Sequence, residues 1–212
     1  MKQLYPDLWQ TSVEMRFGTL RTHAYFLKHS DGHALIYHSE QETDLNEISN
    51  MGGAGHQYLS HNHEIVPTLQ TTSTRLNARL CGHEKMQPYF GTGKGLDVAF
   101  QTSGTEQHAG GLEVVFTPGH TDNNVCYRYV SPHGKTYLFT GDTIYLDQGE
   151  WRTLVMSGDG GDRSTLRESL LRLGEMPADV LITSVAVGEM HIVEVTPSEW
   201  RAITRKLADE LT

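Results

Sequence analysis

Four residues combine the types and the spacing that a metal site needs. The run SHNHE contains His61 and His63, which would project from the same face if the segment is extended. The run TPGHT puts His120 in a rigid turn after a β-branched stretch, and FTGDT puts Asp142 after an apolar stretch and a glycine. Three imidazole nitrogens and one carboxylate oxygen suit Zn²⁺, and also Fe²⁺ or Mn²⁺. The sequence therefore predicts a metal site.

The His-x-His pair alone carries little weight in this chain. The sequence has 12 histidines among 212 residues, so about 0.7 such pairs are expected by chance. The other two motifs make a metal site more plausible. Each places a residue that can bind a metal directly after an apolar stretch, and functional residues often lie in such loops. We expect most of the remaining histidines to be structural or exposed, including His56 and His83.

The elements that must position these motifs are short strands and a few helices. We expect strands at 24–28, 34–38, 56–61, 96–101, 112–117, 124–130, 135–140, 179–186 and 190–195. We expect helices at 42–51, from Pro67 onward, at 165–174 and from Pro197 onward. Because the chain has no repeats and no long linker, we treat residues 1–212 as a single domain. Strands accompanied by helices in both halves predict two packed sheets with helices outside.

Local signals indicate where these helices begin and which side they bury. Leu80 extends the apolar side of the helix that starts at Pro67. Thr165 and Glu168 have the spacing of a capping box for the third helix. Thr196, directly before a proline and three residues before a glutamate, has the pattern of an N-cap for the last helix.

Two further segments lie close to these motifs. Asp159 and Asp162 frame a DGGD loop that lacks the other ligand positions of a calcium loop, so we expect this loop to cap the next helix. Tyr145, Trp151 and Arg152 follow the GDT turn and could line a substrate pocket.

The motifs and their order resemble the metallo-β-lactamase superfamily of metallohydrolases. The resemblance covers most of the chain: a His-x-His loop before a helix, a strand ending in TPGHT, a hairpin ending in FTGDT, and a late helix, strand and terminal helix. It implies an α/β (α+β) fold, a four-layer αββα sandwich with the metal site at one edge between the two sheets. The family includes β-lactamases, glyoxalase II-type thioesterases, lactonases, phosphodiesterases and persulfide dioxygenases, so the fold does not fix the substrate.

The chain departs from the family pattern at the second of the family's two metal sites. The family run is His-x-His-x-Asp-His, but Ile65 and Val66 stand at the last two of these positions, and the late region at 182–188 has no histidine. The resemblance therefore implies one metal ion, held by the four residues above, or none. The missing Asp often manages protons in this family, and Glu64 is the candidate to replace it, with His191 as an alternative.

Three functions remain open at this point. The first is a metal-dependent hydrolase of an ester, thioester, lactone or similar bond, using hydroxide on a single ion, with Zn most expected and Asp142 and Glu64 as catalytic residues. The second is a mononuclear iron oxygenase of the persulfide dioxygenase type, in which His61, His120 and Asp142 form a two-His-one-carboxylate set. The third is a non-catalytic, degenerate family member that acts as a binding module.

Composition limits the partners and the location. The net charge of −9 argues against binding to nucleic acid or to an anionic membrane surface, so we expect a small-molecule substrate. There is no apolar run long enough for a transmembrane helix, and the first residues do not resemble a signal peptide. Two cysteines, Cys81 and Cys126, cannot form a disulfide framework. We therefore expect a cytoplasmic protein, and its oligomeric state stays open.

Overall fold

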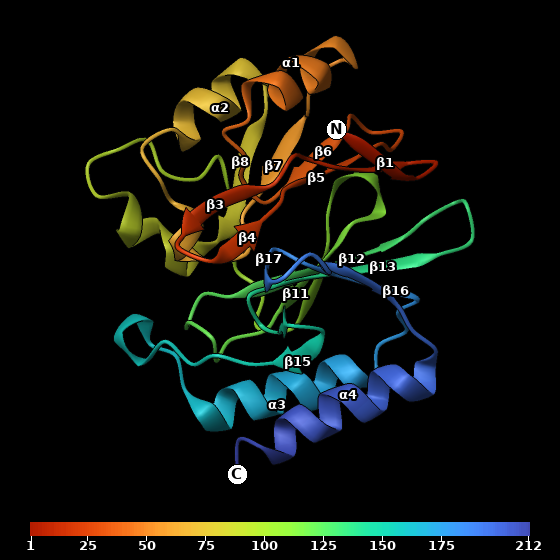
Figure 1. The fold of residues 1–212 in the computed structure, drawn as a ribbon. Helices are drawn as coiled ribbons and strands as arrows, with labels where there is room; N and C mark the ends of the chain where they lie inside the picture. Colours follow the sequence, from red (N-terminus) through yellow and green to blue (C-terminus); the bar gives the residue numbers. More distant parts are fainter.

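The computed structural model describes residues 1–212, except the side chains of Arg16 and Phe17. The N-terminal half is built on a seven-stranded sheet (Figure 1). In spatial order its strands are β1 (Lys2–Tyr5), β2 (Leu8–Gln10), β5 (Tyr25–Leu27), β6 (Ala34–Ile36), β7 (His56–Tyr58), β8 (Arg79–His83) and β9 (Val98–Phe100). The strands from β6 to β9 are parallel, and parallel strands need crossover connections. The first two contain the helices α1 (Glu42–Asn50) and α2 (Leu69–Arg75), and the third, from β8 to β9, contains the 3₁₀ turn η2 (Glu84–Phe90).

The C-terminal half is built on a six-stranded sheet. In spatial order its strands are β10 (Thr105–Gln107), β11 (Glu113–Phe116), β12 (Val125–Val130), β13 (Thr136–Gly141), β16 (Val180–Thr183) and β18 (Ile192–Glu194). β12 and β13 form the predicted antiparallel hairpin. The helices α3 (Arg163–Gly174) and α4 (Pro197–Asp209) pack side by side on its outer face (Figure 1). The layers therefore follow the predicted αββα order.

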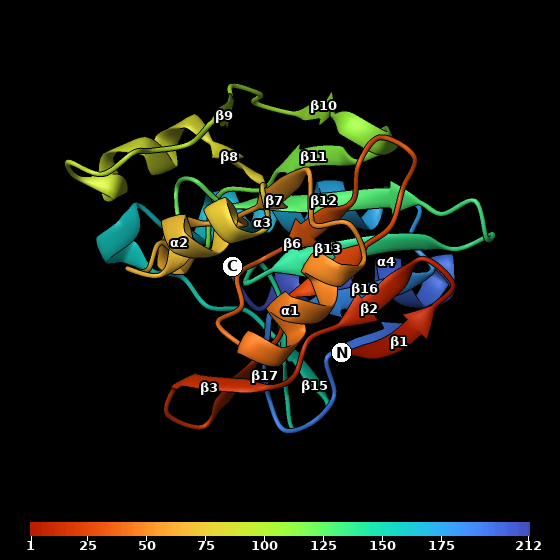
Figure 2. The same cartoon turned by 90° about the horizontal axis from the view of Figure 1, so that it is seen from above.

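A third, five-stranded sheet joins the two halves at one side of the molecule (Figure 2). Its spatial order is β15 (Glu150–Arg152), β14 (Tyr145–Asp147), β17 (Val185–Val187), β4 (Leu20–Thr22) and β3 (Glu14–Phe17). Because β17 pairs with β4, this sheet links late residues to early ones. Four short 3₁₀ turns complete the structure: η1 (Asn62–Glu64), η2 (Glu84–Phe90), η3 (Ala109–Gly111) and η4 (Ser157–Asp159).

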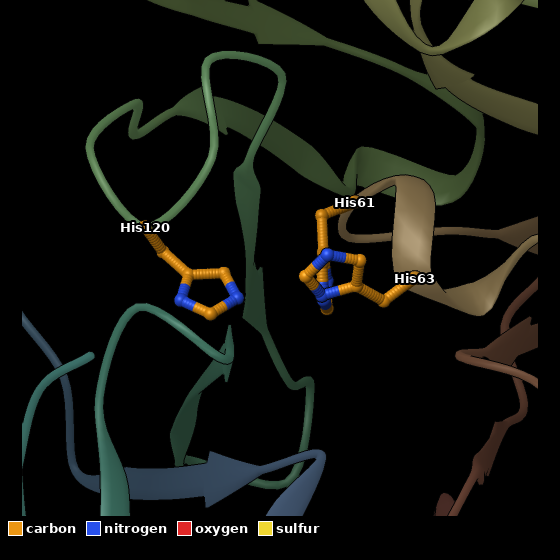
Figure 3. A group of neighbouring side chains, drawn as sticks. All are labelled: His61, His63 and His120. Atoms are coloured by element: carbon orange, nitrogen blue, oxygen red, sulfur yellow. The ribbon is translucent and has the colours of Figure 1, made fainter. Parts of the chain in front are cut away.

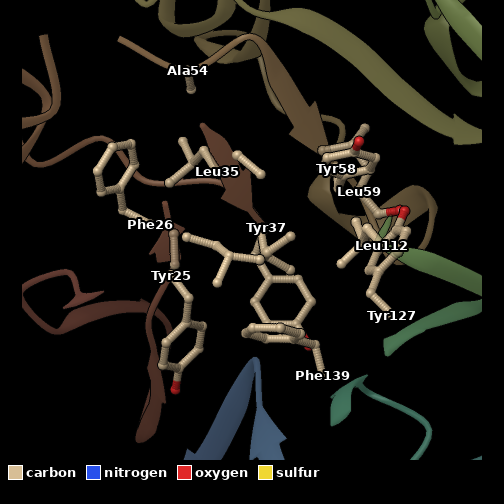
Figure 4. Close-up of a cluster of buried hydrophobic side chains, with 14 of the residues drawn as sticks. Tyr25, Phe26, Leu35, Tyr37, Ala54, Tyr58, Leu59, Leu112, Tyr127 and Phe139 are labelled. Carbon is tan, nitrogen blue, oxygen red and sulfur yellow. The ribbon is translucent and has the colours of Figure 1, made fainter. Parts of the chain in front are cut away.

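Two apolar clusters hold the layers together, and the pleat of the central strands divides residues between them. Tyr127 and Phe139 point into the cluster between the two large sheets (Figure 4). Their chain neighbours Cys126 and Leu138 point to the opposite face, as the two-residue period of a strand requires. There they meet Trp200 of α4, whose indole Nε1 donates to Leu173 O at 3.0 Å.

The structure changes several details of the predicted elements. Leu80 does not lie on a helix, because α2 ends at Arg75 and Leu80 is a core residue of β8. α3 begins earlier than predicted, and its N-cap is Asp162, whose carboxylate accepts from Thr165 N at 2.8 Å. The predicted strand at 179–186 is two strands, β16 and β17, which belong to different sheets and part at Ser184.

The last helix begins as the sequence predicts. Thr196 is the N-cap, Pro197 is the first helical residue, and Thr196 and Glu199 form a capping box. Both cysteines, Cys81 and Cys126, are free and buried. In the described part of the chain, no helix is long and apolar enough to cross a membrane.

Candidate metal centre

Three histidines from two distant loops converge at the edge of the two large sheets (Figure 3). His61 follows β7, His63 lies in η1, and His120 lies in the loop after β11. One nitrogen of each ring lies within 4.8 Å of the others. His61 itself is extended, but residues Asn62–Glu64 form a 3₁₀ turn. The expected reason for the convergence, an extended His-x-His segment, is therefore wrong, and a tight turn brings the two rings together instead.

Paired amides tie the two histidine loops to each other. Asn62 N donates to Asn123 Oδ1 at 3.0 Å, and Asn123 Nδ2 donates back to Asn62 Oδ1 at 3.0 Å. Both side chains are buried, where an unpaired amide would be costly. The spacing between His61 and His120 is therefore set by the protein itself.

Two glycines allow the ligand turns to approach their neighbours closely. Gly119 has φ +132°, and a Cβ there would lie 2.3 Å from the backbone of Leu166. Gly141 has φ +54°, and a Cβ there would lie 2.7 Å from the Ser60 side chain. The Gly141 N–H also donates to the Tyr37 hydroxyl at 2.7 Å. Glycine is required at both positions, which explains why each motif has one beside its functional residue.

Hydrogen bonds fix the protonation of the His61 ring. The Ser60 hydroxyl donates to Glu64 Oε1, so its oxygen is left to accept from His61 Nδ1 at 2.9 Å. Nδ1 then carries the proton, and Nε2 presents its lone pair. Burial, together with the neighbouring rings, lowers the pKa of His61 to about 3, so the ring is neutral at physiological pH.

The other two rings are fixed by acceptors from the segment after β15. His120 Nδ1 lies 2.8 Å from Leu154 O, and since a carbonyl can only accept, Nδ1 is the donor and Nε2 keeps its lone pair. His63 Nε2 lies 3.0 Å from Asp159 Oδ2. The hydrogen bond from His63 keeps the pKa of Asp159 below its ordinary value, so the carboxylate is ionised and accepts, which leaves Nδ1 of His63 available.

Asp142 lies beside two of the available nitrogens. Its Oδ2 is 3.5 Å from His61 Nε2 and 3.9 Å from His120 Nε2, while its Oδ1 accepts from the Ser184 hydroxyl. Burial by itself raises the pKa of Asp142, but the two histidines and the Ser184 hydroxyl outweigh it, and the pKa lies below its ordinary value. Asp142 is therefore ionised and presents one oxygen to the histidines. Its role as a fourth metal ligand stays a prediction.

A divalent metal ion fits these donors. His61 Nε2 and His120 Nε2 are buried and have no hydrogen-bond partner among the described residues, which is costly for a polar atom. A cation between the three rings would use these lone pairs, and each ring already has the outer hydrogen bond that usually orients a metal-binding histidine. Three nitrogens with an adjacent carboxylate are typical of catalytic zinc sites that keep one position open.

Glu64 and His191, the two candidates for proton management, occupy different places. Glu64 lines the cavity beside the histidines, but its Oε1 accepts from Ser60 on the far side of the His61 ring. This contact gives Glu64 a positioning role, and proton transfer by it stays a prediction. His191 is buried and packs edge-on against His23 with ring centroids 4.5 Å apart. His191 does not line that cavity and is not part of the group of three histidines.

Of the other three residues predicted to line a pocket, one lies beside the site and two do not. Tyr145 lines a cavity together with His120 and Asp142, but Trp151 and Arg152 do not line it. His83 ends β8 and stacks on Phe116, in keeping with a structural role.

Sequence reasoning missed the residues that hold the site in place. Ser60, Ser184 and the Leu154 carbonyl carry no pattern that would mark them. Asp159 belongs to a loop whose only visible signal was a helix cap.

Comparisons with known proteins agree with this architecture. Residues 20–185 match the model of the Metallo-beta-lactamase superfamily. A comparison with curated proteins gave no significant match. Similar solved structures include a metallo-β-lactamase from Pontibacter korlensis, with 22% sequence identity, a TM-score of 0.73, and coverage of 98% of this chain and 97% of that chain.

Two further structures show the same likeness. The metallo-β-lactamase FIM-1 from Pseudomonas aeruginosa, in a mono-zinc form, has 17% identity and a TM-score of 0.73, with 98% and 93% of the two chains covered. A motif mutant of a metallo-β-lactamase from Cronobacter sakazakii has 17% identity and a TM-score of 0.66, with 99% and 95% covered. At these identities the likeness shows the fold.

Proposed function

This chain belongs to the metallo-β-lactamase superfamily of metal-dependent hydrolases, and we propose that it uses a single Zn²⁺ ion to hydrolyse an ester, thioester, lactone or similar bond in a small molecule. The observation that carries the proposal is the set of three facing histidines. Each has its second nitrogen held by a separate acceptor: Ser60, Asp159 and the Leu154 carbonyl. A relic site would have no need to keep three rings oriented in this way.

In this proposal, the histidines bind the metal ion and Asp142 acts on the water. His61, His63 and His120 would hold the ion, which when bound lowers the pKa of water and polarises a carbonyl. Asp142 Oδ2 faces the same space and is ionised, so it is suited to orient an entering water and to accept its proton. Water adds to the carbonyl carbon, the bond to the leaving oxygen or sulfur breaks, and the leaving atom takes a proton.

Three features favour one ion over two. Asp142 Oδ1, the oxygen that points away from the histidines, already accepts from Ser184. Ile65 and Val66, at positions where the family has ligands, pack against the apolar core between the sheets. The similar structure from Pseudomonas aeruginosa is described in a mono-zinc form, which supports a single zinc ion in a protein of this fold.

Metal depletion and reconstitution test the proposal. The protein is stripped with a chelator, and hydrolysis of 4-nitrophenyl butanoate is followed before and after addition of Zn²⁺ under anaerobic conditions. We expect activity to vanish on stripping and to return with Zn²⁺. His120→Ala should abolish it, whereas His133→Ala, at an exposed turn, should retain it.

The same experiment separates the alternatives. Full activity in stripped protein would contradict a metal hydrolase. An iron oxygenase would need Fe²⁺ and consume oxygen instead, and a non-catalytic module would bind no metal at the three histidines. Circular dichroism of His120→Ala distinguishes loss of the site from loss of the fold.

A further inference from the structure

Two adjacent cavities border the candidate metal centre and share Leu20, Asp142 and Val185, and they form two lobes of the site. One lobe, the histidine lobe, is lined by His61 and His63. The other, the apolar lobe, is reached by the third histidine. A bond cleaved at the three histidines would therefore have one substituent in each lobe.

One face of the third sheet forms the wall of the apolar lobe. Leu20 of β4 pairs with Val187 of β17, and Val185 lies two residues earlier, so all three side chains share a face. Tyr145 of β14 and Leu154 complete the lobe. Apart from His120 and Asp142 at its inner end, the lobe thus offers carbon surface and one phenol.

Apart from the metal ion that the three histidines would hold, the described part of the site offers no permanently charged cation. Among the side chains that the structure describes, no lysine or arginine lines the histidine lobe or the apolar lobe. Of the arginine side chains that the structure describes on strands of the third sheet, each lies beside a carboxylate: Arg21 Nη2 is 3.9 Å from Glu189 Oε1, and Arg152 Nη2 is 2.5 Å from Glu150 Oε2. The acidic side chains that line the histidine lobe are Asp142 and Glu64.

These surroundings disfavour an anionic substituent for two physical reasons. The Zn²⁺ ion would lie at the three histidines, so a carboxylate or phosphate placed against the Leu and Val side chains of the apolar lobe loses its hydration without a cationic side chain beside it among the described residues. The chain also has a net charge of −9, which repels anions during approach. An uncharged, apolar substituent has neither cost and gains from burial against the Leu and Val side chains.

We propose that the site takes an uncharged ester or related acyl compound, with a short apolar group in the apolar lobe, and rejects substrates that carry an anionic group there. This inference rests on the proposed hydrolase function, whose substrate class it narrows. It excludes acyl compounds that present a carboxylate or phosphate next to the scissile bond.

A matched pair of esters tests the inference. 4-Nitrophenyl 4-oxopentanoate is neutral, and 4-nitrophenyl hydrogen succinate has nearly the same shape but ends in a carboxylate. With zinc-loaded protein, and after subtraction of the rate of each ester without protein, which for the succinate includes attack by its own carboxylate, we expect kcat/KM to favour the neutral ester at least tenfold. Equal values would overturn the inference while leaving the hydrolase function intact.

A charge introduced into the wall should reverse the preference. Leu154→Lys puts an ammonium group into the apolar lobe at a half-exposed side chain, and the main-chain carbonyl that holds His120 remains. We expect the neutral-to-anionic ratio of kcat/KM to fall at least fivefold. Val130→Lys adds the same charge at an exposed position outside both lobes and should leave the ratio unchanged. An equal fall in both variants would contradict a local effect.

Binding of stable analogues separates this inference from the hydrolase function. N-(4-nitrophenyl)-4-oxopentanamide and N-(4-nitrophenyl)succinamic acid are the anilides of the two esters, and calorimetry compares their Kd values. If neither ester is hydrolysed but the neutral anilide binds at least tenfold more tightly, the hydrolase function fails and the preference for an uncharged ligand stands. If the acid binds as tightly as the neutral anilide, or if neither binds, the inference is wrong.

Discussion

Replacing Asp159 with alanine should weaken zinc binding without unfolding the protein. Asp159 accepts from His63 Nε2 at 3.0 Å with one oxygen and from Asn62 Nδ2 at 3.1 Å with the other. It therefore orients both the ring and the turn that carries it, although it is no metal ligand itself. Its side chain is 25% exposed, so its removal leaves no cavity in the core.

The size of the effect follows from what the carboxylate does. Loss of an acceptor that orients a metal-binding histidine typically costs about 10–100-fold in metal affinity, or about 1.4–2.8 kcal/mol. For Asp159→Ala, which loses both contacts, we expect the upper part of this range. For Asp159→Asn we expect about tenfold, because the amide oxygen can still accept but has no charge.

Competition with a chromophoric chelator measures the zinc Kd of each variant. Asp162→Ala is the matched control, because this neighbouring aspartate caps α3 and does not contact the histidines. It should lower the Tm and leave the zinc Kd unchanged, whereas Asp159→Ala should do the opposite. A zinc Kd within twofold of the native value in Asp159→Ala would refute the assignment of His63 Nδ1 as the available nitrogen.

Three further outcomes follow from the structure. Ser184→Ala removes the donor to Asp142 Oδ1, so the pKa of Asp142 should rise and the acid limb of the pH–rate profile should shift to higher pH; an unshifted limb would show that Ser184 does not act on this carboxylate. Burial lowers the pKa of His191 from 6.5 to about 3, so below pH 6.5 the unfolded chain binds a proton that the folded chain does not. The free energy of unfolding in urea should therefore fall by about 2 kcal/mol between pH 7 and pH 5 on account of this one group, and His191→Gln should lose that part of the pH dependence; an unchanged dependence would contradict the burial argument. Thr196→Ala removes one half of the capping box with Glu199, which should cost about 1 kcal/mol and lower the Tm by about 2–4 °C, and an unchanged Tm would show that the cap contributes nothing.

Elements set by local interactions could be predicted from the sequence. The start of α4 needs only Thr196, Pro197 and Glu199, which are neighbours in the chain. The division of the predicted strand at 179–186 into two strands could not be predicted, because both halves are apolar. Only the pairing of Val185–Val187 with β4 distinguishes the second half from the first. The other strands of the third sheet had no signal, since they are three or four residues long and come from distant parts of the chain.

The residues of the candidate site also differ in how far the sequence predicts them. His61, His63 and His120 carry motif signals, and the structure brings these three side chains together. The residues that orient them could not be predicted, because Ser60 and Asp159 act through contacts that exist only after folding. Proton transfer by Glu64 stays a prediction, and the contact with Ser60 shows a positioning role that the sequence did not indicate.

Metal content is the most direct test of the central claim, that three oriented histidines hold a single ion. Protein purified without a His-tag is analysed for zinc, iron and manganese per chain, beside a His61→Ala/His120→Ala double variant with confirmed fold. The account predicts one zinc ion per chain in the native protein and none in the variant. Two ions per chain, or one ion retained by the variant, would contradict it.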